Sequence, residues 1–301
     1  MSGPLSGPAE MPEGHTLHRL AQSINEHFAG QVVEVSSPQG RFVESANLVD
    51  GTGLVDAQAW GKHLFIGFEA HRWIHVHLGL YGTFDVHTGP PAPSVGQVRL
   101  RLVSPSRKGP DGAALTVSST SYADLRGATT CDMITDSQRA AVIARLGPDP
   151  LRADSDPDRV WARISRSRAP IGALLMDQTV LAGVGNVYRA ELLFRHRLHP
   201  LRPGSTLRRG QVGAMWQDLV ELMRAGVSTG RVDTVREEHT PEAMGREPRR
   251  DDHGGEVYVY RRLGQPCHVC GSKVRTEVLA GRNLFWCPKC QPKFRSRAAA
   301  Q

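Results

Sequence analysis

The segment that decides the fold runs from Cys267 to Cys290 and reads CHVCGSKVRTEVLAGRNLFWCPKC. Its two cysteine pairs each enclose two residues and are separated by sixteen residues. This spacing is typical of a tetrahedral zinc site, because two close pairs of thiolates can complete the coordination of one ion. A closed four-thiolate site leaves no position for water, so we expect one structural Zn²⁺ rather than a catalytic one. The predicted ligands are Cys267, Cys270, Cys287 and Cys290.

The residues between the pairs predict a β-hairpin that lacks an adequate core of its own and depends on the metal. Four reduced structural cysteines are the alternative, which this spacing makes improbable. Arg282 is expected at the hairpin tip, where a guanidinium can present a planar fork to a phosphate. A solvated surface arginine explains that position equally well. The fifth cysteine, Cys131, is predicted to be a small buried residue.

The bulk composition is that of a soluble protein, and its charge suits a polyanionic partner. The chain has 301 residues, a formal net charge of +7 and an isoelectric point near 9.5. Nine Lys or Arg against two Glu lie between Glu256 and Arg297, so the basic excess is concentrated near the C-terminus. Basic charge favours nucleic acid without proving it. No apolar run suggests a membrane span and no leader directs export, so we expect a cytoplasmic, monomeric protein.

The first half of the chain predicts a helix followed by strands. Leu17, Leu20, Ile24 and Phe28 recur at helical spacing, and Gly30 follows as a natural stop. Short apolar runs then indicate strands, among them 64–66, 98–103 and 115–117. Between Trp73 and Leu78 the pattern alternates strictly, with Ile74, Val76 and Leu78 on one face and Trp73, His75 and His77 on the other. One sheet face is therefore expected to be buried.

The second half predicts a mainly helical lobe, with helical patterns at 140–146, 160–164, 171–181, 187–194 and 211–225. The segment 236–255 holds almost no apolar residue and is interpreted as a mobile loop. We expect five parts along the chain: an extension that does not pack (1–10, absent from protein translated from Met11), a β-sandwich domain (11–135), a helical domain (136–255), the zinc hairpin (256–291) and a tail (292–301).

Two further motifs carry possible chemistry. In Leu181-Ala-Gly-Val-Gly-Asn186, a helical segment ends in glycines and a new helix begins at Asn186, a good N-cap whose neighbouring amides attract phosphate. A simple glycine C-cap is the ordinary interpretation. In Met11-Pro12-Glu13-Gly14, removal of Met11 would expose a secondary amine that can act as a nucleophile, with Glu13 as a proton donor. In an arbitrary sequence, Pro12 and Glu13 would merely open a helix.

Together these motifs resemble the formamidopyrimidine-DNA glycosylase and endonuclease VIII family from Met11 to Gln291. The Met-Pro-Glu start, Gly61-Lys62, the Leu-Ala-Gly-Val-Gly-Asn turn and the Cys-Pro-Lys-Cys-Gln ending occur in the family's order. The resemblance implies an α+β fold: an N-terminal helix with a β-sandwich, then a helix-two-turn-helix domain carrying the zinc hairpin. It also implies that damaged DNA lies in the cleft between the two lobes.

The resemblance further implies a bifunctional DNA glycosylase and AP lyase of base excision repair. Pro12 matches the nucleophile that attacks the sugar C1′, and Glu13 matches the general acid. Lys62, Asn186 and Arg282 match positions that contact phosphate near the lesion. Leu80 and Tyr81 match the residues that fill the gap left by an extruded base, whereas without the resemblance they are ordinary strand residues. The implied reaction is base excision followed by β- and then δ-elimination.

The endonuclease VIII branch is favoured by Met-Pro-Glu-Gly, Leu-Tyr-Gly and Phe-Trp-Cys-Pro, and this branch prefers oxidised pyrimidines. An enzyme that prefers 8-oxoguanine or formamidopyrimidine remains an alternative, as does a non-catalytic protein of the same fold that binds damaged DNA. A scaffold that docks a partner through 236–255 is a third. Two departures matter: His15-Thr16 stands where the commonest pattern has Pro-Glu, and ten residues precede Met11. If translation begins at Met1, the nitrogen of Pro12 is an amide and cannot form an iminium.

Overall fold

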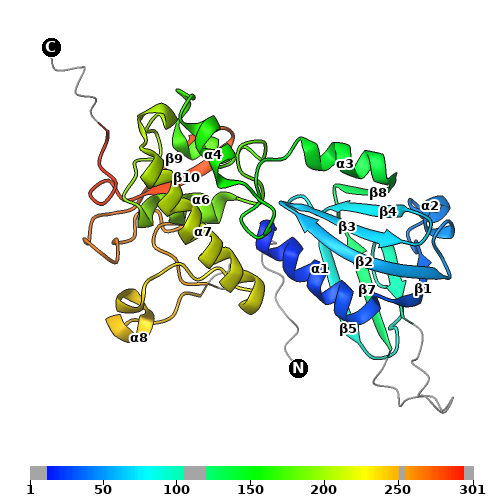
Figure 1. Ribbon diagram of the computed structural model, residues 1–301. Helices are drawn as coiled ribbons and strands as arrows, with labels where there is room; N and C mark the ends of the chain where they lie inside the picture. Colours follow the sequence, from blue (N-terminus) through cyan, green and yellow to red (C-terminus); the bar gives the residue numbers. More distant parts are fainter. Residues whose placement is uncertain (1–11, 105–119, 251–254, 295–301) are drawn as a thin grey trace. The chain divides into compact units, whose positions relative to one another are not determined.

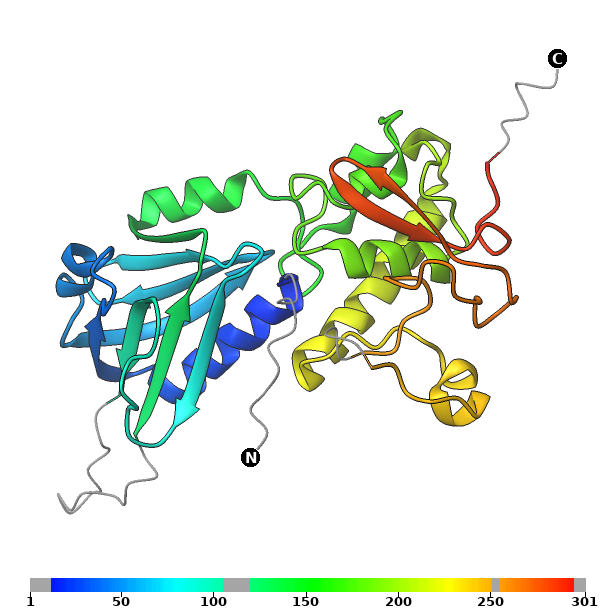
Figure 2. The same cartoon turned by 180° about the vertical axis from the view of Figure 1, so that it is seen from behind.

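The computed structural model describes residues 12–104, 120–250 and 255–294. Contacts divide the chain after Arg145 into two compact units, each with its own hydrophobic core. The first unit is built around strands and the second around helices with a short hairpin (Figure 1; Figure 2). Within the described part of the chain, no helix is long and apolar enough to cross a membrane. The predicted strand at 115–117 falls outside the described residues.

The first unit opens with helix α1 (Gly14–Phe28), which confirms the helix predicted from apolar spacing. Its apolar face belongs to the core of this unit, whereas its opposite face is polar. Gly30 adopts φ +74° just beyond the helix, a left-handed conformation that suits glycine and turns the chain into the first strand. The four residues that predicted the helix are all buried: Leu17, Leu20, Ile24 and Phe28.

Eight antiparallel strands form one continuous sheet in the order β5-β7-β6-β1-β2-β3-β4-β8. The strands are β1 (Gln31–Ser36), β2 (Thr52–Trp60), β3 (His63–Phe68), β4 (Arg72–His77), β5 (Thr83–Thr88), β6 (Val98–Val103), β7 (Ser121–Arg126) and β8 (Thr130–Thr135), with the short helix α2 (Val43–Asn47) after β1. The first half of β1 pairs with β2 and its second half with β6. The sheet thus folds over at β1 into the two layers of a sandwich.

The alternation in β4 is confirmed, but both faces of the strand are covered. Ile74 and Val76 point into the core and are fully buried. On the opposite face His75 is only 8% exposed, because side chains from β3 stack against it. Helix α3 (Asp136–Ala144) follows β8, contacts β4 and β8, and begins with a capping box between Thr135 and Gln138. The face of β4 that carries His75 is therefore packed rather than open to solvent.

The second unit contains the helices α4 (Pro157–Ile164), α5 (Ile171–Leu174), α6 (Asn186–Arg195) and α7 (Arg209–Thr229), with the short elements η2 (Gly204–Thr206), η3 (Glu237–His239) and α8 (Pro241–Met244). The prediction of a helix over 171–181 is wrong, because α5 ends after four residues. Asp177 accepts hydrogen bonds from Thr179, and the Gln178 amide bonds Met176, Gly183 and Val184. These side chains satisfy the backbone without a helix.

The described part of the segment 236–255, which the sequence predicted to be a loop, contains the two short helical elements η3 and α8. Thr240 caps α8, Pro241 occupies its first position, and Gly245 ends it with φ +60°. Arg246 then forms an ion pair with Glu256 at 2.7 Å. Apolar periodicity could not predict these elements, because the segment is polar and each element depends on a capping contact or an ion pair.

Candidate functional site

The proposed nucleophile and acid open the first unit. Pro12 is half-buried and lies directly before α1, while Glu13 occupies the N-cap position of that helix and is only 2% exposed. The Glu13 side chain makes no capping hydrogen bond to α1. A carboxyl at a helix start lies in the favourable field of the helix dipole. Glu13 is therefore buried at the start of α1, and Pro12 directly precedes it.

Lys62 lies in the tight turn between β2 and β3, after Gly61, whose φ of +58° allows the turn. Its charge acts on two neighbouring imidazoles. Burial, then the charges of His18, Lys62 and Arg19, lower the pKa of His15 to about 4. Burial and the charge of Lys62 also lower the pKa of His77. The fold thus brings Lys62 near His15, two residues after Glu13, and near the end of β4.

The turn after β4 presents Leu80 and Tyr81 to solvent, with 43% and 75% of their surfaces exposed. Two glycines hold this turn. A Cβ on Gly82 would lie 2.3 Å from the carbonyl oxygen of Leu78, and Gly79 has φ +74° with Thr129 packed against it. Because Leu80 and Tyr81 are exposed on a tight turn, their side chains can enter a gap in a base stack without loss of core packing.

A pocket of about 610 Å³ lies beside Pro12 within the first unit, and Lys62, Leu80 and Tyr81 are not among its lining residues. Pro12 lines it beside residues from one face of α1, from the turn after β4 and from β5. Sequence reasoning missed the α1 residues, although Thr16, Arg19 and Ser23 follow Pro12 at helical spacing and that spacing is readable. The lining residues are Pro12, Thr16, Arg19, Leu20, Ser23, Leu78 and 82–87.

Beside Lys62, the polar face of β3 and β4 carries a stack of aromatic rings that sequence reasoning did not identify as a cluster. The Nδ1 of His63 lies 2.9 Å from the Nε2 of His75, with ring centroids 5.1 Å apart. Phe65 stacks on His75 at 5.0 Å, and His63 also contacts His77. Burial, followed by the charges of His75 and His77, lowers the pKa of His63 to about 3. Burial also lowers the pKa of His75 to about 4, against an opposing effect of Asp132.

We expect this stack to make the first unit sensitive to acid. In the folded protein the pKa of His75 is about 4, below the ordinary histidine pKa of about 6.5, so the unfolded state binds more protons below about pH 6.5. The contribution of His75 to the free energy of unfolding is fully present above that pH. It is lost as the pH falls toward 4, and the loss has a limit of about 3 kcal/mol.

The variant His75→Phe, which keeps the ring stack, is expected to melt with a weaker pH dependence between pH 7 and pH 4.5. His87→Phe, an exposed position on β5, is the control. Parallel curves for all three proteins would refute the assignment.

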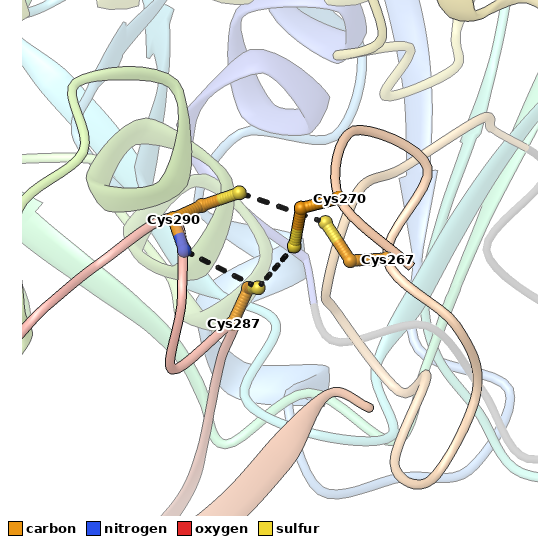
Figure 3. A group of neighbouring side chains, drawn as sticks. All are labelled: Cys267, Cys270, Cys287 and Cys290. Atoms are coloured by element: carbon orange, nitrogen blue, oxygen red, sulfur yellow. Dashed lines mark hydrogen bonds between the residues drawn. The ribbon is translucent and has the colours of Figure 1, made fainter. Parts of the chain in front are cut away.

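The four predicted zinc ligands come together in the second unit (Figure 3). Their sulfur atoms all lie within 4.8 Å of one another, with 3.4 Å between Cys270 and Cys287 and 3.9 Å between Cys267 and Cys290. Tetrahedral Zn–S bonds of about 2.3 Å separate sulfur atoms by about 3.8 Å, so the set fits one zinc ion. No carboxylate or imidazole of the described chain joins the set. The protein carries one structural zinc.

The hairpin of β9 (Arg275–Leu279) and β10 (Arg282–Trp286) joins the two cysteine pairs, as predicted. Ala280 and Gly281 form its two-residue turn with φ +50° and +71°, the conformation that a type I′ turn requires. Arg282 therefore begins β10 directly after the tip. The side chain of Gln291 joins the end of the zinc hairpin to the segment after α6. It donates to the carbonyl oxygen of Leu198 at 2.9 Å and accepts from the amide of Cys287.

Asn186 lies beside this hairpin but is not the N-cap that the sequence predicted. Gly185 takes the N-cap position of α6, and Asn186 is the first helical residue. The Asn186 side chain instead donates to the carbonyl oxygen of Asn283 at 3.0 Å, where Arg189 also donates. Because Asn283 follows Arg282, the start of α6 and the predicted phosphate-binding arginine are held together. Pro12, Glu13, Lys62, Leu80 and Tyr81 belong to the first unit instead.

A second anchor of the hairpin was missed because its partners lie far apart in sequence. Glu191 on α6 is fully buried and accepts hydrogen bonds from the amides of Tyr258, Val259 and Tyr260 and from the hydroxyl of Thr234. Several donors to one carboxylate offset the cost of burying it. Glu191 thus fixes the segment that leads into the zinc hairpin.

Comparisons with known proteins agree with this architecture. Residues 11–131 match the formamidopyrimidine-DNA glycosylase N-terminal domain, residues 146–237 match the formamidopyrimidine-DNA glycosylase H2TH domain, and residues 264–293 match a zinc finger found in FPG and IleRS. Endonuclease 8 1 of Mycobacterium tuberculosis is 52% identical over 93% of this chain and 100% of its own length. A formamidopyrimidine-DNA glycosylase of Parasynechococcus marenigrum is 30% identical over 94% and 99%.

Solved structures show the same fold. The crystal structure of the MutM (FPG) protein from Thermus thermophilus covers 94% of this chain and all of its own, with a TM-score of 0.67 and 25% identity. The Lactococcus lactis Fpg protein in complex with DNA containing an abasic site has a TM-score of 0.71, covering 93% and 100%. The fold and its zinc hairpin define a DNA glycosylase of base excision repair. The chain belongs to the formamidopyrimidine-DNA glycosylase and endonuclease VIII family.

Proposed function

We propose that this glycosylase and AP lyase excises oxidised pyrimidines, with the secondary amine of Pro12 as nucleophile. The observation that carries the proposal is the position of Pro12, which lines the pocket of the first unit directly beside the buried Glu13. Translation from Met11, followed by removal of Met11, frees the amine of Pro12. A free α-amino group has a pKa of about 7.7–8.0, so a substantial fraction is unprotonated near neutral pH.

The reaction proceeds through a covalent intermediate. The nitrogen of Pro12 bonds to the sugar C1′ while the bond between C1′ and the damaged base breaks, and Glu13 supplies a proton for the departing base or the sugar oxygen. Ring opening gives an iminium cation that has no N–H to lose and therefore acts as an electron sink. Successive β- and δ-eliminations then release the 3′ and 5′ phosphates of the site.

Lys62, Asn186 and Arg282 are proposed to bind the phosphates around the lesion. Leu80 and Tyr81 are proposed to occupy the space from which the base has been extruded, because both are exposed on the tight turn after β4. Extrusion costs a few kcal/mol, so a side chain that restores stacking lowers that cost. The relative named Endonuclease 8 1 at 52% identity supports the branch that prefers pyrimidines.

Single-turnover excision rates test the substrate preference. Duplexes that differ only in the lesion would carry thymine glycol, dihydrouracil, 5-hydroxycytosine or 8-oxoguanine, with undamaged DNA as the control. We expect the oxidised pyrimidines to be released at least about tenfold faster than 8-oxoguanine, equivalent to roughly 1.4 kcal/mol in the transition state. Faster release of 8-oxoguanine would reverse the assignment.

Arg282→Ala is expected to weaken DNA binding and to make the plot of log K against log salt concentration shallower by about one unit, as the loss of one phosphate contact predicts. Arg275→Ala is the matched control, since Arg275 is an exposed arginine of the same hairpin at the far end of β9 from the tip. The measurement is affinity for a duplex with an abasic analogue over a range of salt concentrations. A slope that Arg282→Ala leaves unchanged would remove Arg282 from the phosphate-binding residues.

A further inference from the structure

A buried arginine lies in the segment that leads into the zinc hairpin. Arg262 precedes the first zinc ligand, Cys267, by five positions, and only 5% of its surface is exposed. Arginine is almost never fully buried unless it is paired, because removing a charge from water is costly. The surrounding structure therefore has to supply both hydrogen-bond acceptors and negative charge to this guanidinium.

The acceptors for Arg262 are all neutral. Its Nη1 donates to the carbonyl oxygen of Tyr258 at 2.5 Å, and its Nη2 donates to the carbonyl oxygen of Pro266 at 2.8 Å. Its Nε donates to the side-chain oxygen of Gln265 at 3.1 Å. These bonds hold the guanidinium in place but do not neutralise it. Because Pro266 directly precedes Cys267, they also fix the guanidinium at the start of the first cysteine pair.

The negative charge does not come from an ion pair. Among the residues that the structure describes, no carboxylate forms one with Arg262. Glu256, an acid of the same segment, pairs with Arg246 instead. Glu191 is held by three backbone amides and a hydroxyl. Burial lowers the pKa of Arg262, and the negative charges of Glu191 and Cys267 oppose that effect, so Cys267 is close enough to act on the guanidinium.

The zinc site carries a negative charge that its four ligands cannot balance themselves. Four thiolates of charge −1 around one Zn²⁺ leave a net charge of about −2. Cys267 and Cys287 are buried, so water screens this charge weakly on their side of the site. No imidazole or carboxylate of the described chain replaces a thiolate and reduces the charge. A buried cation without an ion-pair partner thus lies next to a buried anionic centre.

We propose that Arg262 is the counter-charge of the zinc site, where its guanidinium balances part of the negative charge of the four thiolates and so raises the affinity for zinc. The guanidinium does not coordinate the ion; it acts through the ligands, as groups around a metal site commonly do. This role explains why a positive charge is retained in the interior of the second unit. Zinc affinity does not depend on the amine of Pro12, so failure of this proposal would leave the proposed catalytic mechanism untouched.

The test separates the charge of Arg262 from its hydrogen bonds. Arg262→Lys keeps the positive charge and loses the planar fork, whereas Arg262→Gln keeps a neutral donor and loses the charge. Arg101→Gln is the matched control, because the Arg101 side chain is only 11% exposed and has its own carboxylate partner, Asp124, in the first unit. Zinc affinity of each full-length protein is measured by competition with a chromogenic chelator, and melting curves of the zinc-loaded proteins establish that each variant folds.

We expect Arg262→Gln to bind zinc at least about tenfold more weakly than the wild type, in the range that loss of a group around the ligands produces. Arg262→Lys is expected to lose less than about threefold, and Arg101→Gln is expected to keep the wild-type affinity. Equal losses in the lysine and glutamine variants would assign Arg262 to hydrogen bonding alone and overturn the proposal, as would wild-type affinity in Arg262→Gln. If Arg262→Gln does not fold, Arg262→Lys decides, and a loss of more than about threefold in that variant refutes the role of the charge.

Discussion

Protein that begins at Pro12 is expected to form a covalent complex with DNA containing an abasic site when borohydride is added, and protein that retains residues 1–11 is expected to form none. The reason is electronic. A terminal proline is a secondary amine with a basic lone pair, whereas Pro12 inside a longer chain is an amide that cannot add to an aldehyde carbon. The expected loss is complete, because no other step replaces formation of the iminium.

The measurement is a gel shift of the reduced complex, accompanied by sequencing of the N-terminus. Equal zinc content and equal affinity for uncleavable abasic-analogue DNA are the controls, since the extension should leave the second unit unchanged. A trapped band from protein whose sequenced N-terminus is Met1 or Ser2 would exclude Pro12 as the nucleophile. Lack of a band from zinc-loaded protein that begins at Pro12 would favour a non-catalytic protein that binds damaged DNA.

Glu13→Gln is expected to lower the single-turnover rate of base excision by roughly 10²- to 10⁴-fold, the range that general acids contribute. Glutamine preserves the size of the buried side chain and removes its acidic proton. Trapping on DNA with a preformed abasic site is expected to decline much less, because no base departs in that reaction. The two substrates therefore separate a proton donor from a residue that merely holds the start of α1.

Glu26→Gln is the matched control for this variant, because Glu26 is an exposed carboxylate of the same helix. It should leave excision, trapping and the melting temperature unchanged. An equal loss of excision and trapping in folded Glu13→Gln protein would instead assign Glu13 to substrate positioning or to proton donation to the sugar oxygen, a step that both substrates share. Excision that survives at the wild-type rate would remove Glu13 from the mechanism.

The sequence predicted those elements whose physical cause lies within a short stretch of chain. Four cysteines at metal-binding spacing predicted the zinc centre, and their sulfur atoms do come together. Apolar residues at helical spacing predicted α1, and strict alternation predicted the buried face of β4. Each of these signals is local, because the period of a helix or strand and the reach of a ligand pair are set by the backbone.

Tertiary structure decided what depends on partners distant in the chain. The region after α5 is irregular because the side chains of Asp177 and Gln178 bond the nearby backbone in place of a helical ladder. Asn186 does not cap α6 because its amide bonds Asn283, 97 positions along the chain. Burial of His75 needs β3, and burial of Glu191 needs the amides of Tyr258, Val259 and Tyr260. Sequence periodicity reports which face of an element is apolar, but not which other element will cover its polar face.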